Sequence, residues 1–258
     1  MKDKEEWFTD VDFWKNFAPL MFDDKRWAEV SGVADSLIRL AALNPKNSPK
    51  VLDLCCGMGR ISAELARRGL NVCGVDICEA FLEAAREDAA HEGLDIEYIK
   101  ADARNFKRPG YFDSVVNVYI SFGYFENPAE DLKLAKNVLE SLKPGGSFIV
   151  ETLGKEIAAR DFTPGECFER DGFTVTTEYK AVDSWSALKN RWILSREGFK
   201  TEKTFTQRLY AATELRPLLL KAGFETVELY GGWDQRPYDQ DAATLIAVAR
   251  KSNNPEKL

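Results

Sequence analysis

The middle of the chain alternates short apolar runs with segments whose apolar residues recur at helical spacing. This alternation is typical of βαβ units that build a parallel sheet, because buried strands are continuously apolar whereas covering helices have one apolar face. The pattern predicts strands at 51–55, 71–75, 96–101, 114–118 and 147–152, and helices at 60–68, 79–92 and 129–142. Lys143-Pro-Gly-Gly146 is expected to end the last of these helices.

A different period begins near residue 166. Apolar and polar residues alternate one by one from Phe173 to Lys180, which is the spacing of an antiparallel strand. Asp171-Gly172 and Glu197-Gly198 supply turn chemistry. Residues 166–208 are therefore predicted to form antiparallel hairpins.

The two ends of the chain add further elements. A helix is predicted at 213–222, stopped by Gly223, with Pro217 acceptable only if the helix begins just before it. Two strands, 225–230 and 243–250, follow it. Residues 7–43 are rich in aromatic side chains and predict amphipathic helices, for which packing on the sheet edge and covering a pocket are equal alternatives.

Composition and charge mainly exclude classes of partner and location. The 258 residues carry 35 basic and 42 acidic side chains, a net charge of −7, and no block of Lys or Arg, which argues against a nucleic-acid partner. The apolar stretches are far shorter than the roughly 18 residues of a membrane span, so no membrane partner is expected. The charged start lacks the pattern of a secretory signal. The five cysteines form no C-x-x-C, which predicts no metal site and indicates reduced thiols in the cytoplasm.

The strongest local signal is the run Val51-Leu-Asp-Leu-Cys-Cys-Gly-Met-Gly-Arg60, in which a strand leads through a glycine-rich turn into a helix. Its two glycines let the backbone approach a ligand closely because they lack a Cβ. Asp53 lies in this strand, and Asp76 ends the next, where an acid can accept two hydrogen bonds from ribose hydroxyls. A dinucleotide fingerprint needs a third glycine at position 62, where the chain has serine. This favours a cofactor with a ribose but without phosphates.

Further motifs follow this turn in order: Gly74-Val-Asp-Ile77, Lys100-Ala-Asp-Ala103, Phe112-Asp-Ser-Val-Val-Asn-Val118, Leu142-Lys-Pro-Gly-Gly146 and Ala222-Gly-Phe224. The ordered set resembles the class I S-adenosylmethionine-dependent methyltransferases from about Lys50 to Lys251. Phe122-Gly-Tyr-Phe125 and Arg208-Leu-Tyr210 are similar to the small-molecule branch (methyltransferase type 11/25-like), in which an antiparallel insertion covers the active site. The resemblance implies an α/β fold: a Rossmann-like sheet of seven strands with N-terminal helices and an inserted small antiparallel β-sheet.

The resemblance also implies an organisation and a cofactor site. Residues 1–258 would form a single methyltransferase domain, with an N-terminal helical cover at 1–48 and an antiparallel β insertion, or lid, at 155–210. Cys55, although the family usually has a smaller residue there, is placed in the site. The implied contacts with S-adenosyl-L-methionine are the methionine moiety at Asp53, Gly57 and Gly59, the ribose at Asp76, the adenine at Ile77, Asp102 and Ala103, and the sulfonium above Asn117 and Val118.

The implied activity is methyl transfer to a nitrogen or oxygen nucleophile of a small molecule by in-line displacement, which needs alignment and a dry pocket more than a strong base. No catalytic residue is assigned; the pocket candidates are Tyr124, Tyr210, Arg208 and Tyr119. His91 is expected on a solvated helix face, and Arg60 at a helix start rather than at a ligand. A Rossmann-type NAD-dependent oxidoreductase and a non-catalytic cofactor-binding scaffold remain as alternatives. The acceptor and the oligomeric state are left open.

Overall fold

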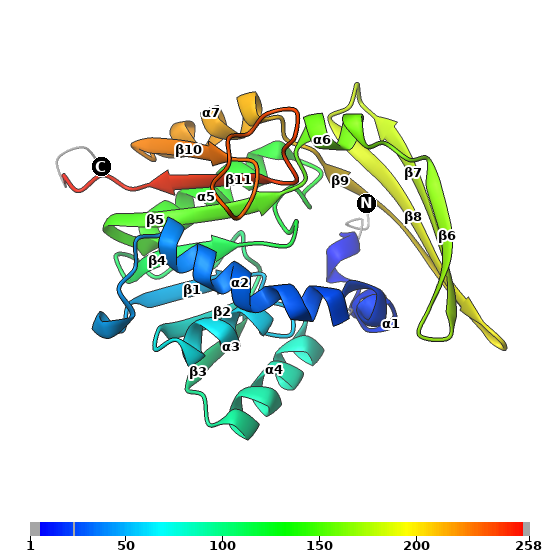
Figure 1. The fold of residues 1–258 in the computed structure, drawn as a ribbon, viewed down its shortest axis with the longest axis horizontal. Helices are drawn as coiled ribbons and strands as arrows, with labels where there is room; N and C mark the ends of the chain where they lie inside the picture. Colours follow the sequence, from blue (N-terminus) through cyan, green and yellow to red (C-terminus); the bar gives the residue numbers. More distant parts are fainter. Residues whose placement is uncertain (1–5, 23, 255–258) are drawn as a thin grey trace, which may run out of the picture.

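A seven-stranded sheet forms the centre of the computed structural model, which describes residues 6–22 and 24–254 (Figure 1). Its strand order is β10-β11-β5-β4-β1-β2-β3. The strands β1 to β5 pair in parallel, whereas β11 is antiparallel to both of its neighbours. This confirms the Rossmann-like α/β fold. The strands are β1 (Lys50–Leu54), β2 (Asn71–Asp76), β3 (Ile96–Lys100), β4 (Phe112–Asn117), β5 (Leu142–Thr152), β10 (Thr226–Tyr230) and β11 (Leu245–Arg250).

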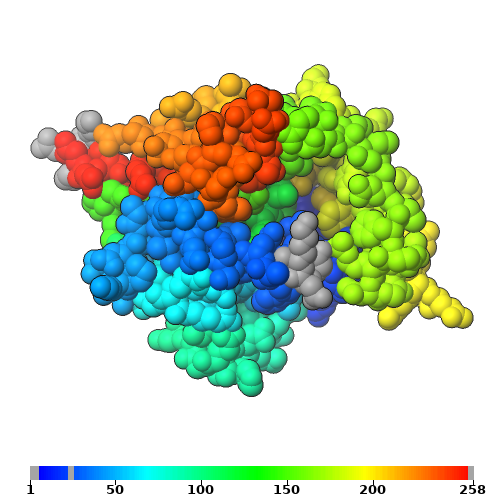
Figure 2. Space-filling view, viewed as in Figure 1, coloured from blue at the N-terminus to red at the C-terminus, as the bar shows by residue number. Residues whose placement is uncertain are grey.

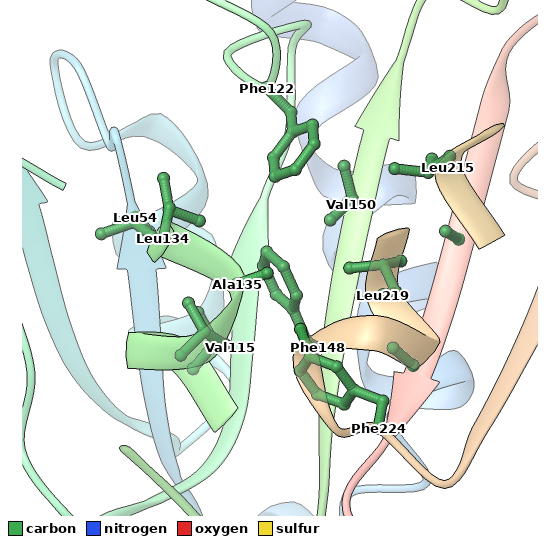
Figure 3. Close-up of a cluster of buried hydrophobic side chains, with 14 of the residues drawn as sticks. Leu54, Val115, Phe122, Leu134, Ala135, Phe148, Val150, Leu215, Leu219 and Phe224 are labelled. Carbon is green, nitrogen blue, oxygen red and sulfur yellow. The ribbon is translucent and has the colours of Figure 1, made fainter. Parts of the chain in front are cut away.

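Helices cover both faces of this sheet. One face packs against α2 (Asp24–Leu40), α3 (Arg60–Arg67) and α4 (Glu79–Glu92), and the other against α5 (Pro128–Ser141) and α7 (Ala212–Ala222). Successive strand side chains point to opposite faces, so Val51 packs with α2 and α3 while Leu52 and Leu54 pack on the side of α5. Figure 3 shows this second core, where Phe148 of β5 lies near Leu219 of α7.

Two local predictions differ from the structure. Lys143-Pro-Gly-Gly146 follows the end of α5 as expected, but these residues belong to β5, which starts at Leu142 and has a register shift against β4. The helix predicted at 213–222 is α7, which begins at Ala212; Pro217 lies well inside it, so the condition that the helix begin just before the proline is wrong. The proline removes only one hydrogen bond in the second turn. Leu215 and Leu219, both fully buried, hold the helix on either side of it.

A second sheet of four antiparallel strands stands apart from the first. Its strands are β6 (Gly165–Arg170), β7 (Phe173–Val182), β8 (Ala187–Arg196) and β9 (Phe199–Arg208), and the short α6 (Lys155–Arg160) precedes them. The turns at Asp171-Gly172 and Glu197-Gly198 are where the sequence predicts them. The turn between β7 and β8 carries no glycine, and Asp183, Ser184 and Trp185 adopt the left-handed conformation there.

The N-terminal segment connects the two sheets. It contains η1 (Trp7–Thr9) and α1 (Val11–Met21), with Asp10 capping α1 by accepting a 3.0 Å hydrogen bond from the Phe13 amide. Phe13 and Phe17 are buried against the four-stranded sheet, whose Phe205 stacks on Trp7. In Figure 2 this segment, in blue, lies between the central sheet and the yellow-green insertion. The division into one domain with a cover at 1–48 and a lid at 155–210 stays a prediction.

No helix within residues 6–22 and 24–254 combines the length and the apolar character needed to cross a bilayer.

Candidate functional site

A cavity of 620 Å³ lies at the carboxyl ends of β1 to β4, between the central sheet and the insertion. This is the edge at which open α/β sheets bind ligands, and the volume is that of a small-molecule pocket. Three parts of the chain form its walls: the strand ends, the N-terminal segment with the start of α2, and the inner face of β6 to β9. Asp53, Asp76 and Asp102, predicted from separate motifs, all line it.

Asp53 is almost fully buried, with 2% of its surface exposed. Its Oδ2 accepts a 2.6 Å hydrogen bond from Ser62 Oγ on α3. Burial raises the pKa of Asp53 to about 6, although this hydrogen bond opposes the shift. Ser62 stands where a dinucleotide fingerprint has its third glycine. Its hydroxyl thus holds the Asp53 carboxylate in place.

Asp76 joins the end of β2 to the glycine turn. One carboxylate oxygen accepts from the Gly57 amide and the other from the Cys78 amide, both at 2.8 Å. Burial raises the pKa of Asp76, and these backbone donors oppose the shift. Each carboxylate oxygen can accept more than one hydrogen bond, so the group retains acceptor capacity towards the cavity that it lines.

Asp102 belongs to a bridge that ties the N-terminal segment to the strand ends. Arg104 Nε lies 3.0 and 3.1 Å from the two Asp102 oxygens, and its two terminal nitrogens donate to Glu6 at 2.9 and 2.6 Å. Burial would raise the pKa of Asp102, but the hydrogen bonds and charge of Arg104 hold it below its usual value. Ile77 and Ala103 also line the cavity.

In the glycine turn, residues 55–59, some residues line the cavity and others lie behind its wall. Gly57 has φ +56° and lines the cavity, where a Cβ would lie 3.3 Å from Phe22 Cζ. Cys55 also lines it, in a left-handed conformation (φ +64°) that favours glycine. Burial raises the pKa of the Cys55 thiol, so it remains protonated. Gly59 lies behind the wall, packed against Tyr98, and its expected contact with a ligand stays a prediction.

Of the two predicted residues at the end of β4, only Val118 lines the cavity. Asn117 is fully buried, and its Nδ2 donates to the Leu54 carbonyl oxygen at 2.8 Å. The side chain therefore holds β4 against β1, and its expected position beneath a ligand stays a prediction.

The chain after β4 makes a strained turn. Tyr119 and Ile120 both have positive φ, a costly conformation for residues with a Cβ. The Tyr119 amide donates to Glu151 Oε2 at 2.7 Å, and Gln207 of β9 donates to the Ile120 carbonyl oxygen at 2.9 Å. The central sheet and the insertion thus fix this turn from two sides.

The four pocket candidates separate into two pairs. Tyr119 and Tyr124 line the cavity, and the Tyr124 ring lies 4.7 Å from that of Trp7. Burial raises the pKa of Tyr124, which keeps its phenol neutral.

Tyr210 and Arg208 do not line the cavity, which corrects the prediction. Tyr210 donates a 2.6 Å hydrogen bond to buried Asp131, and Arg208 donates to the Glu126 carbonyl oxygen at 2.8 Å. Arg208 ends β9 and Tyr210 follows it towards α7, so the two residues tie the insertion to the loop and helix that follow β4. His91 is exposed at the end of α4, as expected.

Sequence reasoning missed three residues with unpartnered polar atoms in the cavity wall: Arg60, Thr177 and Trp192. Arg60 directly follows the glycine turn, a position that could have signalled it. Thr177 and Trp192 belong to the insertion, where no motif marks them. Among the described residues, no cluster of His, Cys, Asp or Glu is arranged to hold a metal ion.

Residues 51–146 match a family model described as a methyltransferase domain. The chain is 25% identical over 210 residues to the putative methyltransferase YqeM of Bacillus subtilis, which covers 79% of this chain and 84% of that protein. It is 34% identical over 117 residues to the ubiquinone biosynthesis O-methyltransferase of Dinoroseobacter shibae, covering 45% of this chain and 46% of the relative. The chain thus matches about half the length of that relative.

Solved structures share the fold at low identity. An S-adenosylmethionine-dependent methyltransferase from Clostridium acetobutylicum superposes with a TM-score of 0.75 at 17% identity, covering 94% of this chain and 97% of that one. The CcbJ methyltransferase from Streptomyces caelestis gives 0.76 at 22% identity, covering 87% and 90%. CalS10, an amino pentose methyltransferase from Micromonospora echinaspora, gives 0.66 at 19% identity, covering 93% and 97%. Residues 51–146 thus match a methyltransferase domain, and the chain shares the fold of solved S-adenosylmethionine-dependent methyltransferases.

Proposed function

We propose that the protein transfers the methyl group of S-adenosylmethionine to a nitrogen or oxygen nucleophile of a small molecule. The observation that carries this proposal is that one cavity joins the three strand-end aspartates to an aromatic compartment beneath the insertion. The first part suits a nucleoside cofactor and the second an acceptor.

The polar groups at the strand ends fit the cofactor. The Asp76 carboxylate suits a pair of ribose hydroxyls, because it can accept a hydrogen bond from each. Ile77 and Ala103 supply apolar contact for the adenine beside Asp102, and the negative charge of Asp53 suits an ammonium group. Gly57 leaves room that a side chain would fill. Of the predicted cofactor residues, Gly59 and Asn117 support this wall from behind.

Bound S-adenosylmethionine supplies a methyl group on a positively charged sulfur. The chain's own part is to align the acceptor and exclude water, which speeds a displacement without a strong base. Trp7, Trp14 and Tyr124 form an aromatic wall, with the Trp14 and Tyr124 rings stacked 6.2 Å apart. The neutral Tyr124 phenol can orient an acceptor nitrogen or oxygen by a hydrogen bond.

The acceptor compartment is bounded by the N-terminal segment and the insertion. The volume of the whole cavity, 620 Å³, suits a small-molecule acceptor, as does the amino pentose named for CalS10. Thr177 Oγ1 and Trp192 Nε1 are its unpartnered polar groups. The methyltransferase match argues against the oxidoreductase alternative. All five cysteines are free thiols, which supports a reducing, cytoplasmic location.

The test is transfer of isotope-labelled methyl groups. The protein is incubated with methyl-labelled S-adenosylmethionine and a metabolite extract, and labelled products are identified by mass spectrometry. We expect label in a discrete small molecule, lost in Asp76→Asn and retained in Asp88→Asn, an equal charge change on the exposed face of α4. Cofactor binding without any labelled product would instead support the non-catalytic scaffold and overturn the proposed activity.

A further inference from the structure

Thr177 and Trp192 are neighbours on the inner face of the insertion. The two residues lie directly opposite each other in the antiparallel pair of β7 and β8. Side chains of such a pair stand on the same face of a sheet, with Cβ atoms about 5 Å apart. Both residues line the cavity. The insertion therefore places a hydroxyl and an indole N–H next to each other in the cavity wall.

Both polar atoms lack a hydrogen-bond partner. Thr177 Oγ1 and Trp192 Nε1 are buried, and neither makes a hydrogen bond to another residue that the structure describes. Because almost none of their surface is exposed, water in the cavity does not satisfy them either. An unpaired buried polar group is costly, and an apolar residue of the same shape avoids that cost. Two such groups side by side therefore indicate a ligand rather than a requirement of the fold.

The surroundings of Trp192 hold its ring but supply no oxygen acceptor. The ring centre lies 5.2 Å from that of Phe205, 6.0 Å from that of Phe17 and 6.2 Å from that of Phe13. Aromatic faces accept an N–H only weakly. The indole is thus fixed by packing, whereas the Thr177 hydroxyl can change direction by rotation about χ1. The pair can adjust to a bound molecule through the threonine.

The charged side chains of the cavity narrow the ligand. Besides the strand-end aspartates, charged residues of both signs line it: Arg26, Glu29, Arg60, Glu166 and Arg170. Of these only Glu166 lies in the same row of the inserted sheet, opposite Thr177. Across Trp192 in that row, Lys203 is paired with Asp10. A negative charge beside the pair disfavours a carboxylate or phosphate there. A neutral oxygen, from a hydroxyl or a carbonyl group, can accept from both donors.

We propose that Thr177 and Trp192 bind a neutral oxygen of the methyl acceptor, separate from the atom that receives the methyl group. This proposal rests on the proposed function and names two residues of the insertion that select the acceptor. The hydroxyl and the indole N–H donate to that oxygen, while the rest of the acceptor packs on the aromatic wall. A molecule without the oxygen leaves both donors unpaired, so the site discriminates against it.

The experiment measures transfer of labelled methyl groups into serial dilutions of one metabolite extract, with S-adenosylmethionine in excess. At high dilution the initial rate reports the relative kcat/KM of each variant. Thr177→Val, which keeps the shape and removes the hydroxyl, should lower this rate by about 3- to 10-fold, and Trp192→Phe by at least as much. The affinity for S-adenosylhomocysteine, measured by calorimetry, should stay at the wild-type value. Tandem mass spectrometry of the wild-type product should locate a hydroxyl or carbonyl oxygen away from the labelled methyl group.

Stability separates this role from a structural one. Removing an unpaired buried hydroxyl should leave the free energy of unfolding of Thr177→Val unchanged or higher, although the rate falls. The matched control is Thr176→Val. Thr176 is the next residue of β7, does not line the cavity, and donates to Cys167 Sγ at 3.6 Å. Its replacement should change neither the rate nor the affinity for S-adenosylhomocysteine.

The contrary results are equally specific. Wild-type rates in both variants overturn the proposal, and so does a labelled product without a second oxygen group, a result that needs no variant. A Thr177→Val protein that is slower only in proportion to a loss of stability makes the threonine structural. Weaker binding of S-adenosylhomocysteine by the variants would assign the pair to the cofactor and also contradict the proposal. Binding of S-adenosylhomocysteine without any labelled product from the wild type overturns the proposed function itself, and the acceptor site with it.

Discussion

Tyr98 of β3 occupies the space that a side chain at Gly74 of β2 would need. A Cβ at Gly74 would lie 2.6 Å from Tyr98 Cδ1, and a Cβ at Gly59 would meet the same ring and lie 2.9 Å from Ala85 Cβ. One buried tyrosine thus accounts for two glycines beside the cavity that do not line it. The requirement for glycine is a matter of packing at Gly74, whereas at Gly59 the positive φ of +74° adds to it.

Gly74→Ala should therefore destabilise the protein through Tyr98. We expect a loss of about 1–3 kcal/mol in the free energy of unfolding, because the added methyl overpacks a filled site. In a Tyr98→Ala background the same substitution should cost much less, since the ring has gone and only Cys56 Sγ, at 3.0 Å, remains close to the added methyl. Chemical denaturation of the four proteins of this cycle measures the coupling. Additive losses would show that Tyr98 is not the cause.

Tyr210→Phe tests the correction that places Tyr210 outside the cavity. The variant loses the hydroxyl that donates to Asp131 Oδ2, while Asp131 Oδ1 already has no partner. The free energy of unfolding should fall by about 1–3 kcal/mol. The affinity for S-adenosylhomocysteine should stay at the wild-type value. A weaker affinity at unchanged stability would return Tyr210 to the binding site.

Asp53 makes stability depend on pH. Its folded-state pKa, about 6, is raised above the ordinary value of 3.8, so the folded protein holds this proton more tightly than the unfolded chain. The stabilising contribution is complete below about pH 4 and is lost as pH rises through about 6.

The matching variant is Asp53→Asn, which cannot ionise. Between pH 4 and pH 7 its unfolding free energy should fall less than that of the wild type, by on the order of 3 kcal/mol. Asp131, Asp76 and Glu151, whose pKa values burial also raises, are present in both proteins, so the difference isolates Asp53. Parallel pH profiles would mean that Asp53 ionises as freely in the folded state as in the unfolded chain.

The sequence predicts the central sheet and its acids well because these features are local. A strand that leads into a glycine turn, as β1 does, or that ends in an acid, as β2 does at Asp76, fixes which end of the sheet carries the group. Parallel strands bring all such ends to one edge. The alternation in residues 173–180 likewise determines the inserted sheet, because its period is a property of consecutive residues.

What the sequence does not reveal depends on contacts between distant segments. Arg208 ends β9 and Tyr210 follows it, but Asp131 and the Glu126 carbonyl oxygen, far away in the chain, decide where they point. The link from Glu6 through Arg104 to Asp102 joins residues nearly 100 positions apart. The exposure of Arg60 to the cavity depends on the N-terminal helices, whose position no motif specifies.

The central claim is that Asp76 holds the ribose of an adenosine cofactor at the strand ends. Its most direct test is calorimetric titration of S-adenosylhomocysteine into the wild type, Asp76→Asn and the exposed control Asp88→Asn. The account predicts tight binding to the wild type and the control, and an affinity at least about 10-fold weaker for Asp76→Asn, because hydrogen bonds to a charged acceptor are lost. An Asp76→Asn variant that binds as tightly as the wild type would contradict it.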